Sequence, residues 1–193
     1  MIQGDITKCF DSIPHSIIMK RVGSQIGDKG FLDTLRKFLG AGYLDPKRGQ
    51  VIKTEYGAPQ GGILSPILSN IVLHSLDEYI AKYTASFQRG RKRRWNPSYK
   101  SLLASGTKRG RSSTEDRQEL LRQMRTMRSV DVFDPNFRRM EYIRYGDDFV
   151  VLISGSFRDS CHIKNNIKDF LKSNCGLELN VDKTIISNIA TDK

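Results

Sequence analysis

The sequence has few of the residues that build disulfide scaffolds or sites for soft metals. Its 193 residues include three cysteines and three histidines, and neither set has the spacing of metal ligands. An odd and scattered set of cysteines argues against a disulfide framework and favours a reducing compartment. No apolar run approaches the roughly 20 residues of a membrane span, so we expect no membrane partner.

Acidic residues are scarce in one part of the chain. The formal net charge is +11, and residues 86–139 hold 15 Lys or Arg against 5 Asp or Glu, whereas the remainder holds 17 against 16. One segment therefore carries nearly all of the positive charge. A basic block of this kind most often contacts polyanions such as nucleic acid. The alternative is a solvated insertion that only keeps the protein soluble.

The hydrophobic residues recur with strand-like spacing in some segments and helical spacing in others. We expect strands at 2–10 and 51–54, helices at 15–39 with a break near 27–30, at 65–83, from 114 and at 157–174, a hairpin at 140–153, and short strands at 177–179 and 184–186. This order favours an α+β layer in which helices cover one face of an antiparallel sheet.

Two adjacent acids lie at the centre of the predicted hairpin. Tyr145-Gly146-Asp147-Asp148 separates two apolar stretches, and Gly146 can take the positive φ that a tight turn requires. Adjacent carboxylates repel each other, and a bound divalent cation is the simplest relief. The alternative is an ordinary acidic turn, since Gly-Asp is common turn chemistry.

A third acid, Asp5, follows the apolar start of the first predicted strand. If this strand lies beside the hairpin, Asp5 and the two hairpin acids would build a two-metal site. Two divalent ions about 3.5–4 Å apart activate a 3′-hydroxyl and stabilise a leaving pyrophosphate. Phosphoryl transfer needs little more than this positioning and charge neutralisation.

Together with these acids, four segments of the chain resemble the motifs of reverse transcriptases encoded in group II introns, also called intron maturases. In chain order, the resemblance is to palm motif A at residues 4–11, motif B at 57–66, motif C at 145–148 and motif D at 177–184. The basic segment, with Asn96-Pro97 and residues 133–139, is similar to the insertion that these enzymes carry between motifs B and C. The resemblance covers essentially the whole chain.

The resemblance implies a fold and a domain organisation. Residues 1–193 would form a partial reverse transcriptase domain of the α+β class, comprising a right-hand polymerase palm and part of the fingers. Its antiparallel sheet would be backed by helices, and residues 86–139 would be the basic insertion between motifs B and C. We expect the thumb and the N-terminal motifs to be absent from this chain.

The implied activity is RNA-directed DNA synthesis, in which two Mg²⁺ ions support the addition of dNTPs to the 3′-hydroxyl of a DNA primer on an RNA template. In the parent protein it implies intron mobility and assistance to splicing, with group II intron RNA as a partner. The family lives in bacteria and organelles. We expect a mitochondrial protein, with the bacterial cytoplasm or a plastid as alternatives.

Two other functions stay open. One is an RNA-binding splicing maturase without polymerase activity, although intact acids at the motif positions argue against it. The other is an RNA-dependent RNA polymerase, because Gly146 stands where the reverse transcriptases more often have Ala. The Pro-Gln-Gly loop and the aromatic residue of motif A favour the reverse transcriptase.

Several roles come to this chain from the resemblance, position by position. Asp5, Asp147 and Asp148 would be catalytic and hold the metals, and the backbone carbonyl of Ile6 would join the coordination. Phe10, five residues after Asp5, would lie under the sugar and clash with a ribose 2′-hydroxyl. The alternative for Phe10 is an ordinary core position.

Three further positions would contact the substrates. Gln60 and Gly61 would approach the incoming nucleotide and the template, and Lys183 would approach the triphosphate as a charge partner or proton donor. The simpler alternatives are that Gln60 caps the following helix and that Lys183 is an exposed lysine without a role.

Nucleic-acid binding is assigned to basic residues at the two ends of the basic segment. These residues are Arg91, Lys92, Arg93, Arg94, Arg138 and Arg139. They would contact mainly phosphates of the intron RNA or of the template–primer duplex, so binding should be salt-sensitive. Trp95 and Tyr99 would stack on unpaired bases or shield the chain from solvent.

Overall fold

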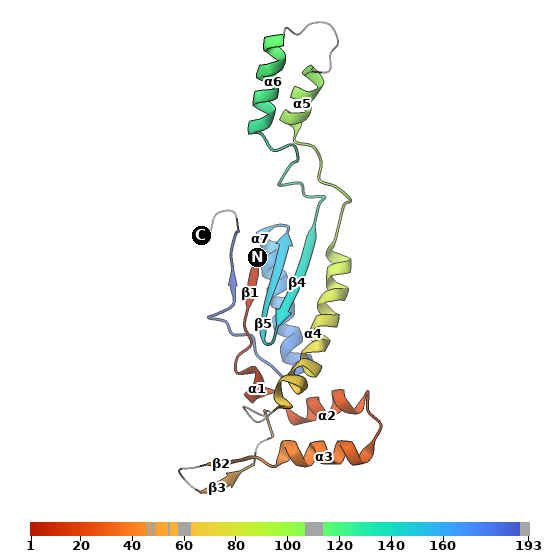
Figure 1. The fold of residues 1–193 in the computed structure, drawn as a ribbon, viewed down its shortest axis with the longest axis vertical. Helices are drawn as coiled ribbons and strands as arrows, with labels where there is room; N and C mark the ends of the chain where they lie inside the picture. The colour runs from red at the N-terminus through yellow and green to blue at the C-terminus, as the bar shows by residue number, and fades with distance from the viewer. Residues whose placement is uncertain (46, 48, 54, 58–62, 107–113, 190–193) are drawn as a thin grey trace. The chain divides into compact units, whose positions relative to one another are not determined.

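The computed structural model of the chain forms two compact units (Figure 1). The residues that the structure describes are 1–45, 47, 49–53, 55–57, 63–106 and 114–189. The first unit comprises Met1–Ser86 and Met140–Lys193, and the second comprises Phe87–Arg139. None of the helices formed by the described residues is long and apolar enough to cross a membrane.

A four-stranded sheet is the centre of the first unit. Its strands are β1 (Ile2–Gly4), β4 (Arg139–Tyr145), β5 (Asp148–Ser154) and β6 (Ile185–Ile186), in the order β4-β5-β1-β6. The short strand β1 pairs antiparallel with β5 on one side and with β6 on the other. The beginning of the chain is therefore an inner strand, joined on both sides to segments from the C-terminal half.

Helices and a small hairpin complete the first unit. They are α1 (Cys9–Ser12), α2 (His15–Gly23), α3 (Lys29–Gly40), the hairpin β2 (Tyr43–Asp45) and β3 (Gln50–Ile52), α4 (Ser65–Phe87), α7 (Phe157–Phe170) and the π-helical segment η1 (Leu171–Cys175). The rings of Tyr79 on α4 and Phe170 on α7 stack at 4.2 Å, and α7 lies behind the strands in Figure 1. Helices and an antiparallel sheet thus form an α+β fold, as expected.

Local signals account for several helix ends. The expected break in the helix at 15–39 is confirmed, because α2 ends at Gly23 and Asp28 caps α3 by accepting from the Phe31 backbone N–H at 3.0 Å. Ser156 and Asp159 form a reciprocal capping box at the start of α7. The strand expected at 177–179 does not form; Leu179 instead makes an isolated bridge to Ile6.

The second unit is a pair of helices joined to two chain segments, 87–96 and 127–139, which we call the stem. Its helices are α5 (Pro97–Gly106) and α6 (Thr114–Thr126). Isolated antiparallel bridges join Arg89 to Arg138 and Trp95 to Val130, so the two ends of the unit run side by side. The sequence predicted α6 but not α5, which starts where Asn96 Oδ1 accepts from the Ser98 backbone N–H at 3.0 Å.

Candidate active site

The pairing of β1 with β5 brings the three predicted catalytic acids to the same end of the sheet. Gly4 lies opposite Phe149 in the register of the two strands. Because the two strands are antiparallel, the next pair of positions is Asp5, which follows Gly4, and Asp148, which precedes Phe149. Asp147, in the turn before β5, lies at this same end, so the strand register puts acids that are far apart in the sequence at one end of the sheet.

A glycine sets the distance between these two strands. A Cβ built on Gly4 would lie 2.2 Å from Cζ of the Phe149 ring, far inside any real contact. The ring is 2% exposed and therefore fills the space over Gly4 inside the core. Because Gly4 precedes Asp5 and Phe149 follows Asp148, this contact fixes the two acid-bearing strands together.

The hairpin has the geometry that its sequence predicts. Strand β4 ends at Tyr145, β5 begins at Asp148, and Gly146 has a φ of 65°. A glycine with positive φ at the first central position of a two-residue loop is typical of a type II′ turn. Asp147 is half-buried and Asp148 is exposed, so the two adjacent carboxylates lie in different environments.

Cys9 on α1 is a buried thiol that is affected by the charges of the candidate acids and of Arg144. Burial, and after it the charge of Asp147, raise the pKa of the Cys9 thiol to about 12, with a smaller contribution from Asp5. The acids of β1 and of the hairpin therefore act on the same buried atom. This thiol stays protonated at neutral pH, which makes it part of the core rather than a nucleophile.

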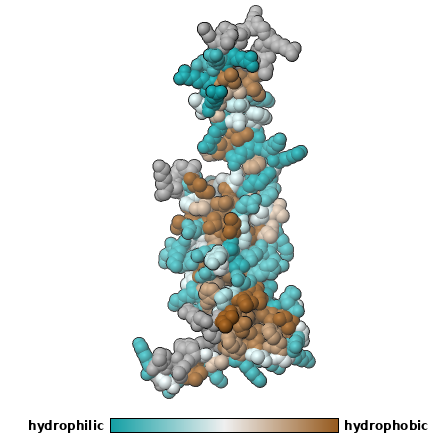
Figure 2. All heavy atoms as spheres, viewed as in Figure 1, coloured by the Kyte–Doolittle hydropathy of each residue, from teal (hydrophilic) through white to brown (hydrophobic). Residues whose placement is uncertain are grey.

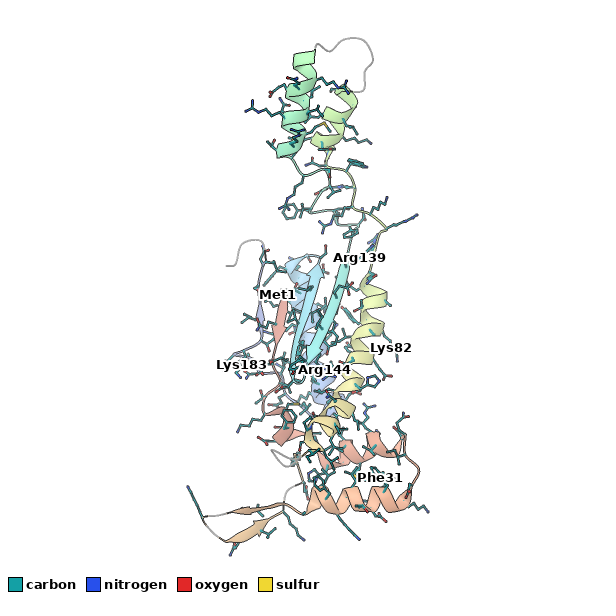
Figure 3. All side chains as sticks on the ribbon, viewed as in Figure 1. Met1, Phe31, Lys82, Arg139, Arg144 and Lys183 are labelled. Atoms are coloured by element: carbon teal, nitrogen blue, oxygen red, sulfur yellow. The ribbon has the colours of Figure 1, made fainter. Side chains whose placement is uncertain are left out.

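Asp5 is held from the far edge of the sheet by residues of motif D. Its Oδ2 atom accepts from Asn180 Nδ2 at 2.9 Å and lies 3.4 Å from Lys183 Nζ. The Asp5 backbone carbonyl also accepts from the Asn180 N–H at 2.9 Å, beside the bridge between Ile6 and Leu179. Lys183, labelled in Figure 3, is therefore an exposed lysine whose ammonium group faces the candidate site.

The donor chemistry of this site suits a hard cation, although its ligands do not converge here. Carboxylate oxygens are the ligands that Mg²⁺ prefers, and the Lys183 ammonium shows that Asp5 accepts a positive charge at this position. Within the described part of the chain, no three His, Cys, Asp or Glu side chains are gathered as a metal-binding group. Asp5, Asp147 and Asp148 thus fit Mg²⁺ by their carboxylate chemistry and by their place at one end of the sheet, but their side chains are not gathered around one point.

The remaining predicted substrate contacts lie after Asp5 and before α4. Phe10 is half-buried in α1, which follows Lys8 in a left-handed conformation with a φ of 44°. Gln60 and Gly61 lie outside the described residues. Just ahead of them, Gly57 is clamped to the segment after α1.

This clamp depends on glycine at position 57. The Gly57 N–H donates to the Ile13 carbonyl at 2.8 Å, and the Gly57 carbonyl lies 2.6 Å from Nε2 of His15. Its φ is +83°, and a Cβ there would lie 2.9 Å from the Asp11 carbonyl oxygen. The start of the motif B segment is thus fixed against the segment that follows Phe10.

Arg144 is a residue of the site that sequence reasoning missed. Its Nε and Nη2 atoms donate to the two carboxylate oxygens of Asp77 on α4 at 2.8 and 2.7 Å. Its Nη1 atom donates to Asn70 Oδ1 at 2.8 Å and to the Gly146 carbonyl at 2.7 Å. No local sequence pattern predicts this contact, because Asp77 precedes Arg144 by 67 positions.

Protonation states in this cluster are fixed by its geometry. Burial acts to raise the pKa of Asp77, but the hydrogen bond and charge of Arg144 outweigh burial and hold that pKa below its usual range. The same hydrogen bond raises the pKa of Arg144. Tyr142, whose hydroxyl donates to Asp77 at 3.0 Å, has its pKa raised by burial and by the Asp77 charge. All three groups keep their ordinary neutral-pH states.

In the second unit, four of the six basic residues assigned to nucleic acid make contacts within the unit itself. Arg94 pairs with Asp131 through Nε at 2.8 Å and Nη2 at 2.7 Å. Arg139 donates to the Arg89 carbonyl at 2.8 Å and lies 4.3 Å from the centre of the Phe137 ring. These contacts shape the stem of the unit.

The other two of these four residues lie over aromatic rings. The Arg93 guanidinium lies 4.9 Å from the Phe137 ring centre and donates to the Val132 carbonyl. Arg138 lies 5.6 Å from the Phe87 ring centre. Arg91 and Lys92 are exposed, as are Arg122 and Arg125 on α6, which the sequence analysis did not select.

Two acids organise this arginine-rich stem. The pKa of Asp131 is lowered, chiefly by the hydrogen bond from the Arg94 side chain. The pKa of Asp134 is lowered by the backbone N–H groups of Arg94 and then Asn136, which donate to it at 2.8 and 2.9 Å. Asp134 is 7% exposed, so a carboxylate occupies the inside of the stem.

Comparisons with known proteins agree with the motifs. The family described as reverse transcriptase (RNA-dependent DNA polymerase) matches residues 1–99. The chain is 39% identical over 186 residues, 96% of its length, to the putative COX1/OXI3 intron 1 protein of Saccharomyces cerevisiae, of which it covers 22%. It is 32% identical over 195 residues, 97% of its length, to the group II intron-encoded protein LtrA of Lactococcus lactis subsp. cremoris, of which it covers 32%.

A third relative adds a plant lineage. The uncharacterized mitochondrial protein ymf11 of Marchantia polymorpha is 26% identical over 184 residues, which are 95% of this chain and 23% of that protein. The chain therefore spans between about a fifth and a third of the length of these three relatives. It belongs to the reverse transcriptase (RNA-dependent DNA polymerase) family and, within it, to the group II intron-encoded reverse transcriptase/maturase proteins.

Proposed function

We propose that this chain is the palm and part of the fingers of an RNA-directed DNA polymerase encoded by a group II intron. The observation that carries the proposal is the β1–β5 register, which sets Asp5 beside the hairpin that carries Asp147 and Asp148. In this proposal the second unit is the basic insertion between motifs B and C. A protein kept only for RNA binding would have no physical need for these mutually repelling carboxylates.

The acids and their neighbours would divide the work of nucleotide addition. Asp5, Asp147, Asp148 and the Ile6 carbonyl would hold two Mg²⁺ ions, which neutralise charge on the triphosphate and the attacking 3′-hydroxyl when bound. Lys183, with Nζ 3.4 Å from Asp5, is in reach of the same site and would hold a proton for the leaving pyrophosphate.

Selection of the sugar would come from Phe10, and contact with the base pair from Gln60 and Gly61. The half-buried ring of Phe10 would leave no room for a ribose 2′-hydroxyl, so deoxynucleotides would be preferred. Substitution of Phe10 by Ala should raise ribonucleotide incorporation while DNA synthesis continues. Unchanged sugar selection in a competition between dNTPs and rNTPs would reject this role.

The second unit would bind the phosphates of intron RNA or of the template–primer duplex. Arg91 and Lys92 keep their assigned role, and exposed Arg122 and Arg125 on α6 join them. The assigned residues Arg93, Arg94, Arg138 and Arg139 would contribute through the shape they give the stem. A mitochondrial origin is the one that we favour, in line with the mitochondrial protein among the relatives.

Primer extension by the full-length parent protein tests the proposal. The assay uses an RNA template, a DNA primer, dNTPs and Mg²⁺, with Asp147→Asn as the test variant. Asp33→Asn is the matched control, because Asp33 is an exposed acid paired with Arg36 on α3. We expect extension by the wild type and the control and its loss in Asp147→Asn.

The other results distinguish the remaining functions. Tight binding of group II intron RNA without extension by the wild type would support a splicing maturase without polymerase activity. Extension that proceeds with rNTPs in preference to dNTPs would support an RNA-dependent RNA polymerase. Equal activity of Asp147→Asn and Asp33→Asn would remove the hairpin from the chemistry.

A further inference from the structure

The turn that carries Asp147 is held by a guanidinium group rather than by packing. Tyr145 is 89% exposed, and a Cβ added at Gly146 would meet no atom within 4 Å. Arg144 Nη1 donates to the Gly146 carbonyl at 2.7 Å. The hydrogen bond therefore reaches the residue immediately before Asp147, at a point where apolar contacts give the turn little support.

The same guanidinium is fixed on its other side by α4. Asp77 accepts from it with both carboxylate oxygens, and Asn70 accepts from Nη1. Asn70 and Asp77 are seven residues apart on one helix, so they lie on the same face, about two turns from each other. A bidentate carboxylate restrains the orientation of a guanidinium as well as its distance. Arg144 is 11% exposed, which limits competition from water.

We propose that Arg144, held by Asp77 and Asn70, is a positioning residue that fixes the turn and thereby the place of Asp147 relative to Asp5. The inference rests on the proposed catalytic role of Asp147. We call this set of hydrogen bonds the Arg144–Asp77 latch. It ties the motif C turn to α4, the helix that follows motif B, so a shift of α4 moves the turn.

A groove borders the latch on one side. Arg144 and Asp77 line a groove of about 700 Å³ together with Arg21 and with residues of α4 such as Ile67 and Ile71. Figure 2 shows hydrophobic side chains gathered in this region, where Ile67 is 54% exposed. Truncation at position 144 would leave a space beside Asp77 that a free guanidinium ion can enter from the groove.

Steady-state kinetics of the full-length protein test the latch. The variants are Arg144→Met and Asp77→Asn, and the control is Arg36→Met, which breaks an exposed arginine–carboxylate pair on α3. A misplacement of about 1 Å costs about 100-fold in rate. We expect kcat for primer extension to fall by about 10- to 100-fold in Arg144→Met, with the KM for dNTP unchanged and with Arg36→Met like the wild type.

Two further kinetic results separate positioning from loss of structure. The double variant Arg144→Met/Asp77→Asn should be no slower than the worse single variant, because both changes break one unit. Methylguanidine should restore part of the kcat of Arg144→Ala and leave Arg36→Ala unchanged. Additive effects, no rescue, or equal loss in the Arg36 control would overturn the proposal.

Amide hydrogen exchange of residues 144–149, measured without substrate, gives a readout that does not depend on activity. We expect faster exchange in Arg144→Met than in the wild type and in Arg36→Met. Unchanged exchange overturns the latch whether or not the protein polymerises. Faster exchange with unchanged kcat overturns the positioning role. A wild type that fails to extend primers rejects the proposed function instead, and the exchange result then decides the latch alone.

Discussion

The two units of the chain are held together by different interactions. The buried apolar side chains among the described residues, such as Ile2, Leu76 and Phe149, all belong to the first unit. In the described part of the second unit, the buried side chain is that of Asp134, while Phe133 is 90% exposed. Exclusion of water from apolar groups depends little on salt and pH, whereas charged hydrogen bonds depend on both.

This difference connects folding with binding in the second unit. Arg94 and Arg139 were assigned to RNA from the sequence, yet their guanidinium groups are bonded to Asp131 and to backbone carbonyls. A phosphate that recruits such an arginine must replace the contact it already makes. In the proposed function, RNA binding and the conformation of this unit would therefore be linked equilibria, and no comparable linkage applies to the apolar core of the first unit.

The same substitution in the two units should have very different effects. Leu76 on α4 is fully buried, and Leu76→Ala should reduce the free energy of unfolding of the first unit by about 2–5 kcal/mol. Leu121 on α6 is 47% exposed, and Leu121→Ala should change stability by about 0.5 kcal/mol or less. Hydrogen exchange under native conditions, compared between the variants, measures both. Similar losses would mean that the second unit has an apolar core after all.

Removal of the buried carboxylate should open the second unit alone. Asp134→Ala leaves the backbone N–H groups of Arg94 and Asn136 without their acceptor, and an unpaired buried donor is costly. We expect faster exchange throughout residues 94–136 and no change in the first unit. Asp134→Asn should have an intermediate effect, because its amide offers one acceptor oxygen whereas each oxygen of Asp134 accepts from one of the two N–H groups. Exchange in Asp134→Ala that matches the wild type would contradict the carboxylate-centred stem.

Acid should weaken the second unit in a milder way. The folded pKa values of Asp131 and Asp134 are lowered by the Arg94 side chain and the Arg94 N–H respectively. A folded carboxylate with a lowered pKa binds fewer protons than an unfolded one. Its contribution is complete above the unfolded pKa of about 3.9 and is lost as pH falls through the folded value.

We therefore expect local opening of residues 94–136 to begin below about pH 4. The measurement is the amide hydrogen-exchange rate of these residues, corrected for the pH dependence of the intrinsic exchange rate. Asp77 in the first unit also has a lowered pKa, so some loss is expected there. The buried apolar side chains of the first unit do not titrate, and they should keep that unit closed. Simultaneous opening of the two units would remove the distinction drawn between them.

The smallest effects should come from the exposed arginines of α6. Arg122 and Arg125 are exposed, so Arg122→Ala and Arg125→Ala remove charges from the surface of α6. Each should weaken RNA binding at low salt and reduce the slope of log K against log salt by about 1. Fluorescence anisotropy with intron RNA over a range of salt concentrations measures the slope. Arg94→Ala is the contrasting variant, because it should also speed amide exchange in the stem.

The sequence predicted well those features that depend on residues close together in the chain. The turn at Gly146 needs one glycine between two apolar stretches, and the helix break before Lys29 needs only local caps. The meeting of Asp5 with the hairpin was expected from the two-metal chemistry and the motifs, and the strand register supports it. The helix at 65–83 continues to Phe87, because helical spacing does not mark where an exposed helix ends.

Features that depend on distant partners could not be predicted in this way. The hydrogen bond between Arg144 and Asp77 joins residues 67 positions apart, and the one between Asp5 and Asn180 joins residues 175 positions apart. The arginines of the stem are bonded largely to carbonyl oxygens, which every residue has and no sequence pattern distinguishes. Helix α5 escaped prediction because its turns bury little, so no apolar stripe marks it.

The contact between Gly4 and Phe149 has a consequence for how the sequence can vary. Any side chain at position 4 occupies space that the ring at position 149 already fills. A substitution at one of the two positions alone is therefore unfavourable. A larger side chain at position 4 becomes acceptable once the aromatic ring at position 149 has been replaced by a smaller side chain. In an evolving population these two positions should change as a pair, through an intermediate that selection removes unless both changes arrive together.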